Sequence, residues 1–145
     1  MATIEVSGLT ELAEAFLRTS NVPKDVKEDI LRTGAKVMAD AIEKEGRSMG
    51  VWDPEWDGKH VLESIKIKDP VVKDNKGYCD ITFEGTRRRG NKTTRNAEIA
   101  FINEYGANRR GISARPFIWN GTAKAEDKAY DAAEEKFHKW LNNTF

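Results

Sequence analysis

The sequence has a single cysteine and no long apolar run, and these scarcities exclude several kinds of protein. Because Cys79 has no second cysteine to pair with, an intrachain disulfide is ruled out and nothing indicates an oxidising compartment. No apolar stretch approaches the roughly 20 residues that span a bilayer. The first residues lack a basic segment followed by an apolar one, so no secretory signal is expected. These features predict a cytoplasmic protein with no membrane segment.

An excess of one charge is also missing, because 24 lysine and arginine residues balance 24 aspartate and glutamate residues. Zero net charge argues against a dedicated nucleic-acid-binding protein, which is usually basic overall. Charged residues make up 33% of the chain, yet its apolar residues recur periodically, so disorder is not predicted. A length of 145 residues suits one domain, 1–145, with one core.

No arrangement of residues typical of a catalytic, metal or cofactor site is present. The two histidines, His60 and His138, lie far apart and show no metal-ligand spacing. The segment from Gly85 to Gly90 is not directly followed by the Lys-Ser/Thr pair and helix start of a phosphate-binding loop, because Asn91 separates Gly90 from Lys92. Cys79 falls in a predicted strand, where small-residue packing is the favoured role. The sequence therefore predicts a protein that is not an enzyme; an enzyme would need a pocket around Glu104, His60 or Cys79 with perturbed protonation.

Hydrophobic spacing predicts an α+β fold. Long helices are expected at 23–47 and from about 116 to 142, where apolar residues recur at helical spacing. Alternation predicts strands at 61–72 and 78–84, joined in an antiparallel hairpin by a turn at 74–77. The segment 97–105 fits either a short helix or a strand. We expect a small antiparallel sheet of about three or four strands packed against the two helices.

Two polar segments, 46–60 and 85–96, are predicted to be mobile loops. The first contains Trp52 and Trp56, which fit two interpretations with equal weight. They either fill the base of the core or are exposed anchors for another subunit, because tryptophan is enriched at interface hot spots.

The second loop has no apolar residue and is strongly basic. Its five cations are Arg87, Arg88, Arg89, Lys92 and Arg95. A second basic group, Arg109, Arg110 and Arg115, follows the segment 97–105, and the two groups would meet at one end of the domain if that segment folds back. The cluster is either a solvated loop or a contact for DNA phosphates or an acidic patch on a partner.

Three short motifs follow one another in the chain. Residues 62–65 read Leu-Glu-Ser-Ile, residues 100–106 read Ala-Phe-Ile-Asn-Glu-Tyr-Gly, and residues 114–118 read Ala-Arg-Pro-Phe-Ile. In this order they resemble the small tail-completion, or neck, proteins of long-tailed bacteriophages of the siphophage type. The resemblance extends over nearly the whole chain, and the arginine-rich segment 85–96 departs from the family pattern.

The resemblance implies a structural protein of the virion tail or neck, present in the host cytoplasm during assembly and encoded by a phage or a prophage. It implies a homo-oligomeric ring, commonly a hexamer, that joins the tail tube to the head connector. It implies no cofactor, no membrane and no enzymatic activity. The alternative function is a nonspecific nucleic-acid-binding accessory protein that uses the basic residues 87–95.

Six residues of the last two motifs are expected to hold the fold: Glu104, Tyr105, Gly106, Arg115, Pro116 and Phe117. Gly106 permits a sharp reversal that a side chain would hinder. Pro116 fixes φ at the helix start and directs Phe117 towards the core. Arg115 is poorly placed for the helix dipole, which favours anions there. We therefore expect Arg115 to pair with Glu104 or with a neighbouring subunit.

Overall fold

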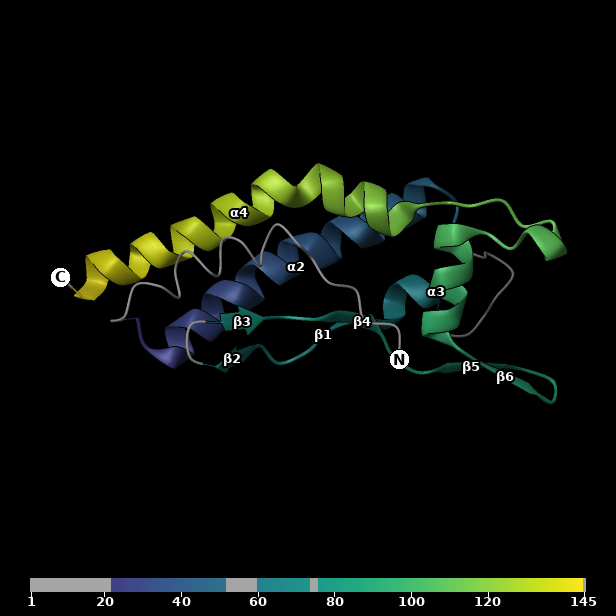
Figure 1. The fold of residues 1–145 in the computed structure, drawn as a ribbon, viewed down its shortest axis with the longest axis horizontal. Coiled ribbons are helices and arrows are strands. Elements are labelled where there is room, and N and C mark those ends of the chain that lie inside the picture. Colours follow the sequence, from purple (N-terminus) through teal and green to yellow (C-terminus); the bar gives the residue numbers. More distant parts are fainter. Residues whose placement is uncertain (1–21, 52–59, 74–75, 145) are drawn as a thin grey trace.

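The computed structural model describes residues 22–51, 60–73 and 76–144, and it has the predicted α+β fold. Trp52 and Trp56 lie outside the described residues. Two long helices, α2 (Lys24–Ser48) and α4 (Phe117–Thr144), run side by side along the molecule. Short strands follow α2 on its other side, and α3 (Asn96–Tyr105) lies at one end with the strands β5 (Thr86–Arg89) and β6 (Lys92–Arg95) (Figure 1).

Helix α2 confirms the predicted helix at 23–47 to within one residue at each end. It begins directly after Pro23, and its buried face includes Ile30, Met38 and Ile42, which repeat at the spacing of an amphipathic helix. Because α2 continues to Ser48, the loop predicted at 46–60 starts later than expected. This buried face forms the centre of the hydrophobic core.

Helix α4 confirms the predicted C-terminal helix and presents small residues to α2. Its buried positions repeat every four residues: Phe117, Gly121, Ala125, Ala129 and Ala133. A Cβ atom on Gly121 would lie 2.8 Å from the Cα atom of Ile42, so the two helices approach closely at this point. Phe117 is fully buried and meets Phe83 edge to face, with ring centroids 6.0 Å apart.

The central hairpin is interrupted by a change of register. β1 (Ile65–Ile67) pairs antiparallel with β4 (Ile81–Phe83), and β2 (Val71–Lys73) pairs with β3 (Lys76–Tyr78). Ile67 lies opposite Ile81 but Val71 lies opposite Tyr78, so the first strand carries one extra residue. Pro70 lies in this gap and has no N–H to donate to a ladder. The expected sheet of three or four strands is therefore replaced by separate two-stranded ladders.

The strand predicted at 61–72 was placed too early in the chain, because Val61–Ser64 forms the 3-10 helix η1. The Glu63 carboxylate accepts a hydrogen bond from the His60 N–H at 3.1 Å, and the Ser64 hydroxyl donates to the Val61 carbonyl at 2.6 Å. These local bonds to the backbone stabilise a turn in place of a ladder. The predicted turn at 74–77 is also too long, since Lys76 and Gly77 belong to β3.

The predicted loop at 85–96 is wrong, because this segment folds into a β-hairpin. β5 (Thr86–Arg89) pairs antiparallel with β6 (Lys92–Arg95), with Arg89 opposite Lys92. Only Gly90 and Asn91 connect the strands, and Gly90 has a φ of 60°, which suits a tight hairpin turn. Five of the eight strand residues of the hairpin are cations and none is apolar, so alternation of apolar and polar residues could not reveal the strands.

The segment 97–105 was expected to form either a short helix or a strand, and it forms the helix α3. Asn96 stabilises the start of α3 through two hydrogen bonds. Its side-chain amide donates to the Glu84 carbonyl at 3.0 Å, and its backbone N–H donates to the Gly85 carbonyl at 3.0 Å. The inner face of α3 carries the buried residues Ala97, Ala100 and Glu104. The hairpin and α3 are thus held next to each other.

Candidate interaction site between the hairpin and α3

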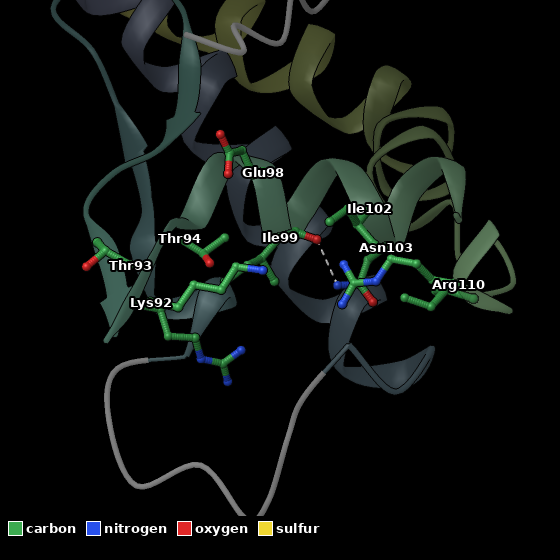
Figure 2. Close-up of a pocket in the computed structure, with 10 residues that line it drawn as sticks. Lys92, Thr93, Thr94, Glu98, Ile99, Ile102, Asn103 and Arg110 are labelled. Atoms are coloured by element: carbon green, nitrogen blue, oxygen red, sulfur yellow. Dashed lines mark hydrogen bonds between the residues drawn. The ribbon is translucent and has the colours of Figure 1, made fainter. Parts of the chain in front are cut away.

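A cavity of about 420 Å³ separates the β5–β6 hairpin from α3 and the segment after it. Arg87 and Lys92 reach it from the hairpin, and Arg110 reaches it from the short 3-10 helix η2 (Asn108–Arg110). Lys92 and Arg110 extend into this space from opposite sides (Figure 2). The expectation that the two basic groups meet at one end of the domain is therefore confirmed.

The charges that line the cavity are unevenly balanced. Among the described residues, Glu98 is the one acidic residue of the lining, beside the cations Arg87, Lys92 and Arg110. Oε1 of Glu98 already accepts hydrogen bonds from Nη2 and Nε of Arg95, at 2.7 and 3.1 Å. Because Arg95 compensates this carboxylate, Lys92 and Arg110 leave the described part of the lining with a positive charge.

The remaining lining combines an apolar floor with neutral polar groups. Ile99 and Ile102 come from α3, and Ile112 comes from the loop beyond η2. Asn103 lies between them and donates its side-chain N–H to the Ile99 carbonyl at 2.9 Å. Threonines 93 and 94 complete the hairpin wall. The cavity thus offers cations at its edge and aliphatic surface at its base.

The loop that carries Arg110 is fixed by its own backbone. Ala107 and Ile112 exchange two N–H···O hydrogen bonds of 2.9 and 3.1 Å. Gly106 starts this loop with φ 75° and ψ 179°, a region that only glycine adopts readily. A Cβ atom there would lie 2.8 Å from both the Ala114 nitrogen and the Ile112 oxygen. The reversal expected at Gly106 is confirmed.

Glu104 caps the N-terminus of α4 from the end of α3. Its side chain is buried, and its two carboxylate oxygens accept hydrogen bonds from the backbone N–H groups of Ile118 and Trp119 at 2.7 and 3.0 Å. A carboxylate at this position satisfies two otherwise unpaired donors and complements the helix dipole. The sequence singled out Glu104 without identifying these partners, which lie 14 and 15 residues further along the chain.

The pairing expected between Arg115 and Glu104 is wrong. Nη1 of Arg115 donates to the carbonyl of Gly50 at 2.6 Å, and its backbone N–H donates to the carbonyl of Asn103 at 2.6 Å. Both oxygens of Glu104 are occupied by helix N–H groups, which explains why the guanidinium binds elsewhere. Pro116 directly precedes α4, and Phe117 is buried as expected.

Exposed aromatic rings lie near this cap. Phe101 and Tyr105 lie next to each other on the outer face of α3, with ring centroids 4.5 Å apart and a tilt of 46° between the rings, and they are 54% and 68% exposed. Trp119, in the first turn of α4, is 73% exposed. Trp119 was not among the residues predicted from sequence. Because it lies outside the four-residue repeat of buried α4 positions, its exposure could have been predicted. Large exposed aromatic residues at one junction are typical of an interface.

Three of the other predicted basic residues lie beside the cavity without lining it. Arg88 and Arg95 are exposed on the hairpin, and Arg109 is exposed on η2. Arg88 donates through Nε to the Gly90 carbonyl at 3.0 Å. Arg89 belongs to β5.

Within residues 22–51, 60–73 and 76–144, no cluster of three or more histidine, cysteine, aspartate or glutamate residues could hold a metal ion. No helix among these same residues is long and apolar enough to cross a membrane. Burial raises the pKa of the Cys79 thiol to about 11, and this thiol donates to the Lys68 carbonyl at 3.3 Å. No protein-family model, curated protein or solved structure matches this chain.

Proposed function

We propose that this chain is a structural phage or prophage protein that completes the tail and joins it to the head connector. It would act as a homo-oligomeric ring in the virion, after a period in the host cytoplasm. The observation that carries this proposal is the gathering of a cationic cavity and exposed aromatic rings around α3, at one end of the molecule. Such a combination of anchors and charge suits a surface that other subunits cover.

The placement of two motifs supports the resemblance on which the proposal draws. The segments 100–106 and 114–118 lie apart in the sequence, yet Glu104 of the first binds the backbone N–H of Ile118 in the second. Arg115 of the second also donates its backbone N–H to Asn103 of the first. Both motifs therefore form one structural unit, as a shared fold would require.

The distribution of charge supports contact between copies of the chain. Residues 86–115 hold eight of the 24 lysine and arginine residues but only two of the 24 acidic residues. Because the net charge is zero, the rest of the chain has an excess of acid. A basic end of one copy can then meet a more acidic surface of the next, a heterologous contact of the kind that closes rings.

The proposal is tested by measuring the mass of the purified protein, alone and after incubation with tail tubes and head connectors, by analytical ultracentrifugation. We expect the protein to join these structures as a ring, and Trp119→Ser to weaken this association. Tyr130→Ser is the matched control, because Tyr130 is another exposed aromatic residue of α4, 44% exposed. If the wild-type protein joins neither structure, the proposed function is wrong.

A second candidate function is favoured by the exposed cations of the hairpin, Arg88, Lys92 and Arg95. They could contact DNA phosphates without reading sequence, as a nonspecific nucleic-acid-binding accessory protein does. Binding of the free protein to duplex DNA that weakens steeply with salt, and that is lost when residues 87–89 are neutralised together, would support this function over the first.

A further inference from the structure

We propose that the cavity between the hairpin and α3 binds a short extended segment of a partner protein that presents acidic and aliphatic side chains together on one face. This inference rests on the proposed function, because it names the chemistry of the partner that the joining surface would recognise. It follows from three properties of the cavity: its charge, its floor and its open strand edges.

The charge of the cavity selects an anionic ligand. Lys92 and Arg110 extend into it from opposite sides, and Arg87 contributes a third cation (Figure 2). Glu98, which carries the one carboxylate among the described lining residues, is held by Arg95 and points away from Lys92 and Arg110. Carboxylates that enter between the two cations would form charge-assisted hydrogen bonds.

The floor of the cavity selects aliphatic side chains together with that charge. Ile99, Ile102 and Ile112 expose hydrocarbon surface that phosphate groups and sugars do not use. The volume of about 420 Å³ falls within the range of ligand pockets and is enough for a few side chains. A duplex DNA backbone would gain from the cations but nothing from the isoleucines, so an acidic and aliphatic peptide fits better.

The hairpin also provides a means of holding an extended chain. Within the described residues, β5 and β6 pair only with each other, so each strand keeps one edge unpaired. An extended segment can add to such an edge through backbone hydrogen bonds and direct alternate side chains to one face. A segment in which every second residue is in turn acidic and aliphatic would place both kinds of side chain against the cavity.

The proposal is tested by fluorescence anisotropy with a labelled short peptide that carries aspartate and leucine in turn at every second position, with serine between them. The comparison probes are the same peptide with aspartate in place of leucine, the same peptide with lysine in place of aspartate, and a short duplex DNA. We expect the aspartate–leucine peptide to bind at least about tenfold more tightly than any comparison probe, because only this peptide satisfies both the cations and the floor.

Two neighbouring arginines provide a matched pair of variants. Arg110→Glu should weaken peptide binding by at least about tenfold, whereas Arg109→Glu, which changes the same charge outside the lining, should change it less than about threefold. Ile102→Thr should weaken the aspartate–leucine peptide and leave the aspartate peptide unchanged. Lys92→Glu provides a second charge reversal at the cavity. Because Lys92 is exposed on the hairpin, we expect this variant to fold.

The outcomes separate this inference from the proposed function. Equal binding of the aspartate peptide, competition by duplex DNA at equal concentration, or equal effects of the two arginine variants would overturn the acidic–aliphatic assignment. Absence of peptide binding would overturn it as well, even if the protein still joins tail tubes in the ultracentrifuge. Peptide binding by a protein that joins no tail structure would instead refute the proposed function alone.

Discussion

Removal of the Glu104 carboxylate should destabilise the protein more than any other loss of a single acidic group on α3. The side chain is buried, and its oxygens accept hydrogen bonds from the N–H groups of Ile118 and Trp119. In Glu104→Ala both donors lose their acceptor, at a cost of about 1–3 kcal/mol for each group that stays out of contact with water. The loss of the negative charge at the start of α4 adds up to about 2 kcal/mol.

Partial access of water to the truncated site would recover some of this cost, so we expect the free energy of unfolding to fall by about 3 kcal/mol. For a chain of this size, that corresponds to a fall of about 9 °C in Tm. Glu104→Gln should cost about 2 kcal/mol, because the amide keeps one acceptor but presents N–H groups to the other donor.

The measurement is urea unfolding followed by circular dichroism and tryptophan fluorescence, with Glu98→Ala as the control. Glu98 is a half-exposed acidic residue of the same helix that pairs with Arg95, so its removal should cost less than about 1 kcal/mol. A loss below about 0.5 kcal/mol for Glu104→Ala would refute the view that this carboxylate holds the helix start.

Three further outcomes are expected. Gly106→Ala should lower the free energy of unfolding in urea by more than about 2 kcal/mol, since the φ of 75° and the backbone atoms at 2.8 Å both oppose a Cβ atom. Gly111→Ala should lower it by only about 1 kcal/mol, because no atom lies within 4 Å of the added Cβ. Arg115→Ala should lower the free energy of unfolding by about 1 kcal/mol through loss of its hydrogen bond to Gly50, and wild-type stability and assembly would contradict this. The Cys79 pKa is 9.0 in the unfolded chain and about 11 in the fold, so the unfolded state loses its proton first and stability should fall between pH 9 and 11. Cys79→Ala should lose this component of the pH dependence, which unfolding curves across that range would detect.

The two long helices were predictable from sequence because their buried faces are built from regular apolar spacing. Phe117 and the alanines of α4 repeat every four residues, and the apolar residues of α2 show the same periodicity. Such a pattern depends on the local chain alone, so no knowledge of the tertiary structure is needed to recognise it. The hairpin had no such pattern, and its remaining signals were threonines of high strand propensity and the turn pair Gly90-Asn91.

The candidate site was predictable only in part. The basic residues of the site stand out as a cluster in sequence, and the structure brings Arg87, Lys92 and Arg110 to one cavity. The apolar floor could not be predicted, because Ile102 and Ile112 line the cavity only after the hairpin and the loop pack around α3. Sequence spacing also could not show that Glu104 caps a helix 14 residues away, since this contact depends on the reversal at Gly106.

The capping of α4 by Glu104 also has a mechanical consequence. One wall of the cavity is α3, and the last turn of α3 grips the first turn of a 28-residue helix that runs to the opposite end of the molecule. A push or pull on that wall can reach the start of the helix through the Glu104 side chain and through the hydrogen bond from the Arg115 N–H to the Asn103 carbonyl. A subunit seated at this end of the protein would thereby act on a helix whose other end lies at the far end of the molecule.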